Sequence, residues 1–160
     1  MNYKKIAKVA VVVSAVVFLF MQFIQPNRDN PSFDSAKTLQ SELAIPANIS
    51  SLLDRGCKDC HSNKTVWPFY SYIAPASWLV SYDVMEGRKH FNMSEWGKYK
   101  FNKKVQKLSG IYQAVTDRSM PLPKYIPLHS EANFSDAERD TLARWAQTTA
   151  EKMMGGEEEE

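Results

Sequence analysis

The sequence predicts an all-α fold, and three observations carry this prediction. No segment alternates apolar and polar residues as a β-strand does, and no internal repeat is visible along the 160 residues. Ser135 is followed three residues later by Glu138, ahead of a periodic apolar run, which is the capping box of a helix start. The composition, 44% hydrophobic and 24% charged, suits a folded chain and excludes disordered and collagen-like ones.

The first helix is expected in an apolar N-terminal segment, residues 6–24, that reads IAKVAVVVSAVVFLFMQFI. A helix of this length reaches roughly 28 Å, close to the hydrocarbon thickness of a bilayer. Lys4 and Lys5 precede the run, which favours a cytoplasmic N-terminus. Bulky residues stand where a cleaved signal peptide would have small ones. We therefore expect residues 1–24 to be an uncleaved signal anchor rather than a cleaved signal or a buried core helix. It would be a single transmembrane helix in the inner (cytoplasmic) membrane, with the rest of the chain in the periplasm.

The remaining chain divides into a linker, a helical domain and a tail. Three prolines mark residues 25–47 as a linker, and residues 154–160 form a solvated acidic tail. Between them, residues 48–153 form the domain. Its helices are expected from Ser50 or Ser51 to His61, Pro75–Glu86, about Asn102–Val115 and about Asp136–Met153. An aromatic stretch, 62–74, and a proline-rich loop, 116–134, separate them.

Charge and cysteine content exclude two classes of protein. The net charge of +2 is too small for a dedicated nucleic-acid binder, so no nucleic-acid partner is expected. The chain has two cysteines, three positions apart, which excludes a small fold stapled by several disulfides.

Both cysteines belong to the motif Cys57-Lys58-Asp59-Cys60-His61. C-x-x-C-H is the covalent attachment site of c-type haem. The two thiols can add to the two vinyl groups of one haem. His61, on the same helix face as Cys57, then becomes the proximal iron ligand. A thioredoxin-like redox pair would need a βαβ context, and a zinc site would need a second ligand pair; the sequence offers neither. It therefore predicts one covalently attached haem c, held by Cys57, Cys60 and His61.

Longer stretches around this motif resemble the bacterial haem-binding domain family. They are Cys57 to Val80, Asp83-Val84-x-Glu86-Gly87-Arg88, Asn92-x-Ser94-Glu95-Trp96, Met120-Pro121-x-Pro123-x-Tyr125 and Leu128-His129-x-x-Ala132-x-Phe134-Ser135. The resemblance covers roughly residues 45–150. It implies a small, usually membrane-anchored c-type cytochrome with a cytochrome c-like helical fold and one covalent haem. It does not identify physiological partners.

The second axial position of the iron decides the function. The candidates are Met85, Met93, Met120, Met153, Met154, His90 and His129. Met120 is favoured because it precedes Pro121 in a proline-rich loop that leads into the last helix. This order resembles small class I cytochromes c, in which the first and last helices cross; that would bring Leu53 near Leu142 or Trp145. An ordinary packing role for Met120 is the alternative, and His129 is the rival ligand.

Five aromatic residues follow the motif: Trp67, Phe69, Tyr70, Tyr72 and Trp78. Most are expected in the core, and some would wall the haem edge and exclude water from the iron.

Taken together, the sequence predicts a membrane-tethered monohaem c-type cytochrome that transfers single electrons to unidentified redox proteins. It would be a carrier rather than an enzyme, with His61 and Met120 as axial ligands. If the sixth position is open or weakly held, the alternative is a gas sensor or a peroxidase-like enzyme. A third interpretation is a redox module that docks onto a larger oxidase or peroxidase complex.

Overall fold

The computed structural model describes residues 2–155, and all regular structure among them is helical, which confirms the all-α class. The α-helices are α1 (Tyr3–Met21), α2 (Leu39–Glu42), α3 (Ala47–Gly56), α4 (Lys58–His61), α5 (Ala76–His90), α6 (Phe101–Thr116) and α7 (Asp136–Gly155). Short 3-10 turns lie at η1 (Ser35–Lys37), η2 (Phe69–Tyr72), η3 (Met93–Lys98), η4 (Ile126–Leu128) and η5 (Ser130–Ala132). The glutamates of the predicted acidic tail, Glu157 to Glu160, lie outside the described residues.

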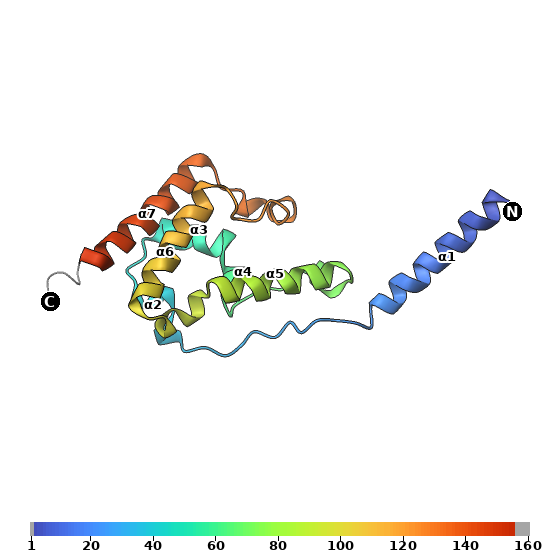
Figure 1. The fold of residues 1–160 in the computed structure, drawn as a ribbon, viewed down its shortest axis with the longest axis horizontal. Coiled ribbons are helices and arrows are strands. Elements are labelled where there is room, and N and C mark those ends of the chain that lie inside the picture. Colours follow the sequence, from blue (N-terminus) through green and yellow to red (C-terminus); the bar gives the residue numbers. More distant parts are fainter. Residues whose placement is uncertain (1, 156–160) are drawn as a thin grey trace.

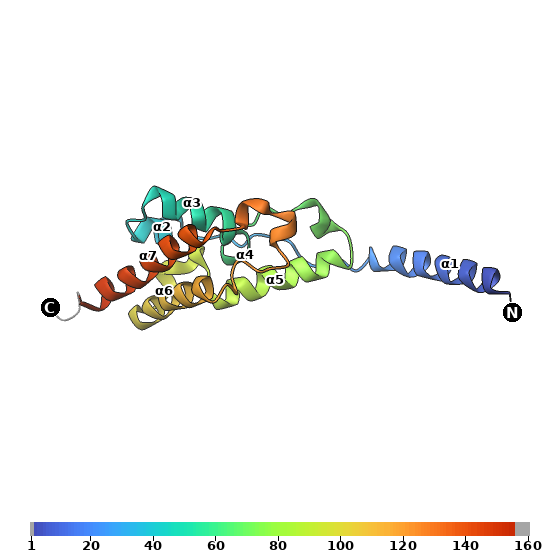
Figure 2. The same ribbon diagram turned by 90° about the horizontal axis from the view of Figure 1, so that it is seen from above.

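Helices α2 to α7 gather in one body, and α1 projects away from one end of it (Figures 1 and 2). Helix α1 begins after Asn2, whose side chain accepts a hydrogen bond from the amide of Lys4, and no residue of α1 is buried. Three lysines, Lys4, Lys5 and Lys8, lie within its 19 residues. The predicted transmembrane helix is not found: within residues 2–155, no helix combines the length and the apolarity needed to cross a membrane.

The core of the body is a layer of helices around α6 and α7, which lie side by side (Figure 1). The capping box predicted for α7 is present, since Ser135 and Glu138 exchange hydrogen bonds at 2.8 and 3.3 Å. Helix α3 packs against α7, and both Leu53 and Leu142 belong to the core cluster, with Trp145 at its margin. The fully buried members of that cluster include Leu39, Leu53, Trp96, Leu108 and Leu142.

The helix predicted to run from Ser50 or Ser51 to His61 differs at both ends. It begins earlier, at Ala47 directly after Pro46, so Ser51 lies inside the helix and caps nothing. It is also interrupted at Cys57, whose backbone dihedrals of −126° and −36° depart from helical values. The motif therefore starts a new turn, α4, instead of continuing α3.

Residues 25–47, predicted to be a linker, lie along the body and contribute to its core. Leu39 is fully buried, and Thr38 beside it is buried as well. Further towards the N-terminus the chain is extended, and its polar groups bond to the domain: Asn30 donates to the carbonyl of Thr65 at 3.0 Å. Arg88 on α5 donates to the side chain of Asn30 at 2.6 Å. We call residues 22–31 the strap.

Candidate functional site

The C-x-x-C-H motif lies where α3, α4 and α5 meet. Cys57 occupies the break between α3 and α4, and Cys60 and His61 close the single turn of α4. A 2.8 Å hydrogen bond from the amide of His61 to the carbonyl of Cys57 fixes that turn. Both thiols are free and partly buried. The turn therefore presents two sulfur atoms and one imidazole from five consecutive residues, as covalent haem attachment requires.

The imidazole of His61 is oriented by its own backbone surroundings. Its Nδ1 lies 3.0 Å from the carbonyl oxygen of Phe91, which follows α5. Because a carbonyl only accepts, Nδ1 carries the hydrogen, and Nε2 is left with a free lone pair. Burial also lowers the pKa of His61, so the ring is neutral near pH 7. A neutral histidine whose second nitrogen is fixed by a carbonyl is the arrangement typical of iron-ligating histidines.

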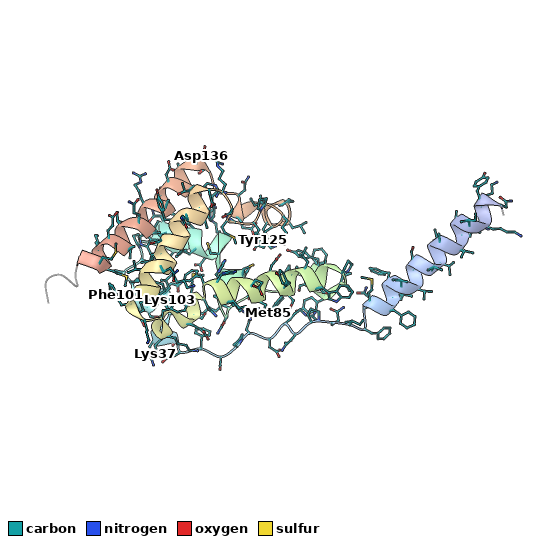
Figure 3. The ribbon with its side chains drawn as sticks, viewed as in Figure 1. Lys37, Met85, Phe101, Lys103, Tyr125 and Asp136 are labelled. Atoms are coloured by element: carbon teal, nitrogen blue, oxygen red, sulfur yellow. The ribbon has the colours of Figure 1, made fainter. Side chains whose placement is uncertain are left out.

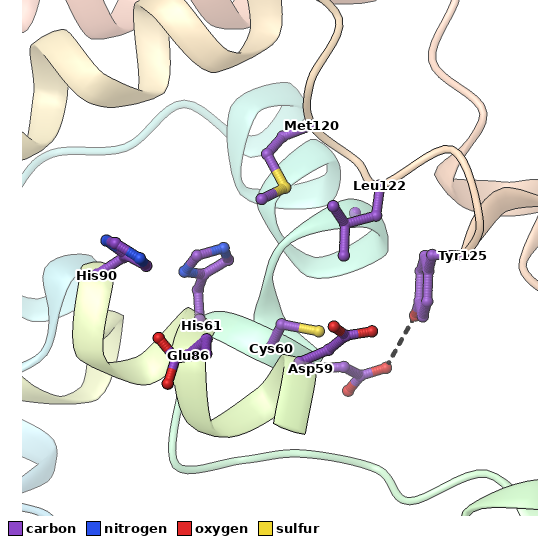
Figure 4. Close-up of a pocket in the computed structure, with 11 residues that line it drawn as sticks. Asp59, Cys60, His61, Glu86, His90, Met120, Leu122 and Tyr125 are labelled. Carbon is purple, nitrogen blue, oxygen red and sulfur yellow. Dashed lines mark hydrogen bonds between the residues drawn. The ribbon is translucent and has the colours of Figure 1, made fainter. Parts of the chain in front are cut away.

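Met120 faces His61 across a cavity, and Figure 4 shows its sulfur directed towards the ring. Two adjoining cavities, of about 210 and 300 Å³, both have His61 and Met120 in their walls. The loop that carries Met120 is held at the backbone. Its amide donates to the carbonyl of Ala114 at 3.0 Å, and its carbonyl accepts from the buried guanidinium of Arg139 at 2.8 Å. An imidazole and a thioether thus lie on opposite walls of one crevice.

The other candidates for the second axial position lie elsewhere, apart from His90. Met85 is half exposed on α5, Met93 is buried beside Gln40, and Met153 and Met154 lie at the end of α7. None of these four lines a cavity that contains His61. His90 does, but Figure 4 places it beside His61 and not opposite the ring. His90 is nevertheless exposed to solvent, at the edge of that cavity.

Both ring nitrogens of the rival ligand, His129, are engaged within the protein. Nε2 lies 2.7 Å from the hydroxyl of Tyr70, and Nδ1 lies 3.2 Å from the carboxylate of Glu131. The ring also stacks on Tyr125 at a centroid distance of 3.8 Å. His129 lines a third cavity, of about 170 Å³, that reaches Cys60 but not His61. The geometry therefore favours Met120 over His129.

Acidic side chains gather on the Cys60 side of the crevice. Asp59, Asp83 and Glu86 line the same cavity as His61. The carboxylate of Asp59 accepts a 3.3 Å hydrogen bond from Tyr125, whose pKa is raised by burial and by that carboxylate. The other end of the crevice is apolar, because Phe91, Ile111 and Val115 line it. Lys107 also lines this end, and no acidic side chain does. Asp83, Glu86 and Tyr125 belong to the stretches that carry the family resemblance, but the sequence assigned none of them a role at the site.

Two glycines bring the backbone close to the motif. A Cβ at Gly87, inside α5, would lie 2.5 Å from the carbonyl oxygen of Cys60. A Cβ at Gly56 would lie 2.4 Å from the ring of Phe134 and 2.9 Å from Pro121 in the Met120 loop. Helix α5 was predicted to stop at Gly87 but continues to His90, because this glycine serves close packing instead of ending the helix.

The two other chemistries open to a C-x-x-C pair have little support. Burial raises the pKa of the Cys57 thiol to about 12 and that of Cys60 to about 11, whereas redox and metal-binding cysteines have lowered values. No group of three or more metal-binding side chains occurs in residues 2–155, so a zinc site has no ligand set there. Two protonated thiols, an oriented imidazole and a facing thioether fit a haem.

Comparisons with known proteins support haem binding. A model of the haem-binding domain family matches residues 16–148. The chain is 29% identical over 121 residues to the cytochrome c peroxidase Ccp of Escherichia coli (strain K12), a match that covers 70% of this chain and 26% of that protein. The chain thus spans about a quarter of the length of this curated relative. No solved structure matches it. The chain belongs to the haem-binding domain family.

Proposed function

We propose that this protein is a monohaem c-type cytochrome that transfers single electrons. The thioether of Met120, directed across the cavity towards the imidazole of His61, carries this proposal. When bound, the haem supplies an iron that alternates between Fe(III) and Fe(II). His61 and Met120 would be the side chains that hold this iron, and the soft sulfur of Met120 would favour Fe(II).

Within this proposal each residue of the site has a separate task. Cys57 and Cys60 provide the thiols for two thioether bonds, and the turn of α4 keeps both beside His61. The carbonyl oxygen of Phe91 accepts a hydrogen bond from Nδ1 of His61 and so favours the tautomer whose Nε2 can bind a metal. Arg139 holds the Met120 loop in place through its carbonyl. The apolar wall formed by Phe91, Ile111 and Val115 excludes water, which favours the less charged, reduced form.

We also propose that the haem domain works on the outer side of the cytoplasmic membrane, close to lipid. In bacteria c-type haem is attached on that side, and the lysines followed by an apolar run in α1 are typical of a segment that directs export. The apolar side chains of α1 have no partner among the described residues, which suits contact with lipid. Haem staining of membrane, periplasmic and cytoplasmic fractions tests this placement.

A peroxidase-like enzyme is the second candidate, and the similarity to a cytochrome c peroxidase favours it. It differs from the carrier in one respect, because peroxide must reach an open iron position. The match covers about a quarter of that peroxidase, so the shared region is a part of it and its activity is not transferred by the match alone.

Optical spectra separate the two candidates. The full-length protein is made in a host that matures c-type haem, and spectra are recorded oxidised, reduced, and reduced with carbon monoxide. A carrier gives a low-spin spectrum that carbon monoxide leaves unchanged. Met120→Ala then opens the site to carbon monoxide, whereas the control Met85→Ala, at a half-exposed position, leaves the spectrum as it is. Carbon monoxide binding or peroxide turnover by the wild-type protein would favour the enzyme instead.

Retention of haem under denaturing conditions tests the attachment. Covalently bound haem stays with the chain in acidified organic solvent, while non-covalent haem is extracted. Loss of retention in a Cys57→Ala, Cys60→Ala variant is expected, because both thioether bonds are removed.

A further inference from the structure

Two stretches of the chain carry no charge at all. Residues 9–27 cover most of α1 and the start of the strap, and residues 65–82 cover η2 and the first half of α5. With 24% of all residues charged, two uncharged runs of this length are unusual for a water-exposed surface. The first run is the segment for which lipid contact is proposed above.

The structure joins the two stretches at a single clasp. The side-chain amide of Gln22, at the end of α1, pairs with the backbone of Ala74: its oxygen accepts from the amide at 2.9 Å, and its nitrogen donates to the carbonyl at 3.1 Å. The indole of Trp78 donates to the carbonyl of Ile24 at 2.6 Å. Arg28 adds a bond to the carbonyl of Ser71 at 3.1 Å. Helix α1 therefore leaves the domain from a fixed point between η2 and α5.

Around this clasp, large apolar side chains are exposed. Phe69 is 77% exposed and Tyr82 57%, and they are joined by Phe23, Ile24, Tyr72, Ile73, Trp78 and Leu79. We call this set the junction surface. Most of the five aromatics after the motif were expected in the core, and for Phe69, Tyr72 and Trp78 that prediction is wrong. Figure 3 shows that the side chains of α1 and of the adjoining end of the domain are not covered by other parts of the chain.

We propose that the junction surface rests on the lipid bilayer, at the level of the headgroups. This rests on the proposed lipid contact of α1 and adds where the domain itself meets the membrane. Tryptophan and tyrosine concentrate at this level because their rings are apolar and their N–H and O–H groups reach water. Arg28, the first charged residue after α1, lies 4.4 Å from the ring of Tyr72, where its cation can meet lipid phosphates.

This docking would fix how the haem site faces the membrane. Leu79 belongs to the junction surface and also lines the cavity beyond Cys60, together with Tyr70 and His129. The Cys60 side of the crevice thus lies next to the proposed lipid contact. Because these hydrogen bonds hold the domain to α1, the orientation of the domain relative to the membrane is restricted. Its redox partners are then expected to be proteins whose own cofactor lies near the membrane surface.

Hydroxyl-radical footprinting of the full-length holoprotein on vesicles of phosphatidylcholine and phosphatidylglycerol tests the proposal. Oxidation is read residue by residue, with the urea-denatured protein as the reference for intrinsic reactivity. Phe69 and Tyr82 are expected to be protected about fivefold by lipid burial, while Tyr112, 38% exposed on α6, stays reactive because α6 lies away from α1 (Figure 1). A spectrum of the same sample confirms that the haem site is intact.

Three other outcomes would overturn the proposal. If α1 is protected but Phe69 and Tyr82 react like Tyr112, the helix contacts lipid and the domain stands away from it. If α1 also reacts freely, the proposed lipid contact of α1 fails as well. The electron-transfer proposal is judged separately, because a low-spin haem spectrum of the same sample would still support it. If protection rises with the ratio of protein to lipid, a second copy of the chain covers the surface.

Charged substitutions provide an independent measurement. Phe69→Asp and Tyr82→Asp are each expected to reduce flotation with vesicles about tenfold, because a carboxylate resists burial at the interface. Tyr112→Asp is the matched control and leaves flotation unchanged. Equal flotation of all three variants contradicts the proposal, provided that their haem spectra match the wild type.

Discussion

Replacing Gly87 by alanine tests whether close packing of α5 against the motif builds the haem site. Gly87 lies inside α5, where alanine is ordinarily the better residue by about 1 kcal/mol. At this position the new Cβ would lie 2.5 Å from the carbonyl oxygen of Cys60 and 3.0 Å from its Cβ. Because that oxygen belongs to the backbone of α4, it cannot rotate away, and the two helices must separate.

The expected effect follows from two opposing terms. Overpacking of this kind costs about 1–3 kcal/mol, which outweighs the gain in helix propensity. We therefore expect Gly87→Ala to lower the free energy of unfolding by up to about 2 kcal/mol. Gly110, in the middle of α6, is the comparison, since a Cβ there meets no atom of the chain within 4 Å. Because Gly110 lines the cavity of about 300 Å³ shared by His61 and Met120, its variant serves as a control when its haem spectrum matches the wild type. Gly110→Ala should raise the free energy of unfolding by about 0.5–1 kcal/mol.

Both variants are unfolded in urea as haem-containing proteins, and their helix content is followed by circular dichroism. A shift of the unfolding midpoint reports a change in stability when the dependence of the unfolding free energy on urea concentration is the same as in the wild type. Haem content per chain is measured alongside. Gly87→Ala should also lower haem content, because α5 carries the chain on to Phe91, whose carbonyl orients His61. If Gly87→Ala stabilises the protein as Gly110→Ala does, or leaves haem content unchanged, the packing argument is refuted.

Three further predictions concern the loop, the last helix and the strap. Arg139→Ala should cost about 1–3 kcal/mol by leaving the carbonyl of Met120 unpaired, and should let carbon monoxide compete at the reduced iron, as optical titration would show. Hydrogen bonds lower the pKa of Glu138 to about 2, so its contribution to stability is complete above pH 4.5 and is lost as the pH falls towards 2. Glu138→Gln should flatten acid unfolding in that range. Gln22→Ala should speed hydrogen exchange at the amide of Ala74 and leave the haem spectrum unchanged.

The parts of the fold that local chemistry decides were predictable from the sequence. Helix α7 is an example, because Ser135 and Glu138 define its start without help from the rest of the chain. Haem binding is another, since the spacing of five residues predicted it and the family match supports it. Met120 could be singled out only by its order in the chain; its position opposite His61 depends on Arg139, which no local pattern connects to it.

Features decided by tertiary contact were missed for a common reason. The break at Cys57 and the continuation of α5 past Gly87 both depend on the close approach of α5 to the turn of α4. No local sequence pattern predicts this contact between two helices. Residues 25–31 of the strap were expected to be part of a linker because of their prolines and polar residues. Those polar residues instead bond to the domain, as Asn30 does to Thr65. Exposed aromatics such as Phe69 were assigned to the core because composition cannot distinguish a buried ring from one exposed beside α1.

If Met120 holds the iron as proposed, the choice between carrier and peroxidase would depend on whether the Met120 loop can move away from the crevice. Three contacts oppose that movement: its amide bonds to Ala114, its carbonyl bonds to the buried Arg139, and Pro121 packs against Gly56. Each buried hydrogen bond left unpaired costs about 1–3 kcal/mol, so a spontaneously open site would be rare. Peroxidase activity in this chain would need something that releases the loop, such as a partner or a change in oxidation state. A low-spin resting spectrum that becomes high-spin after Arg139 is replaced would favour the carrier over the peroxidase and would identify the Arg139 contact as one that holds the Met120 loop in place.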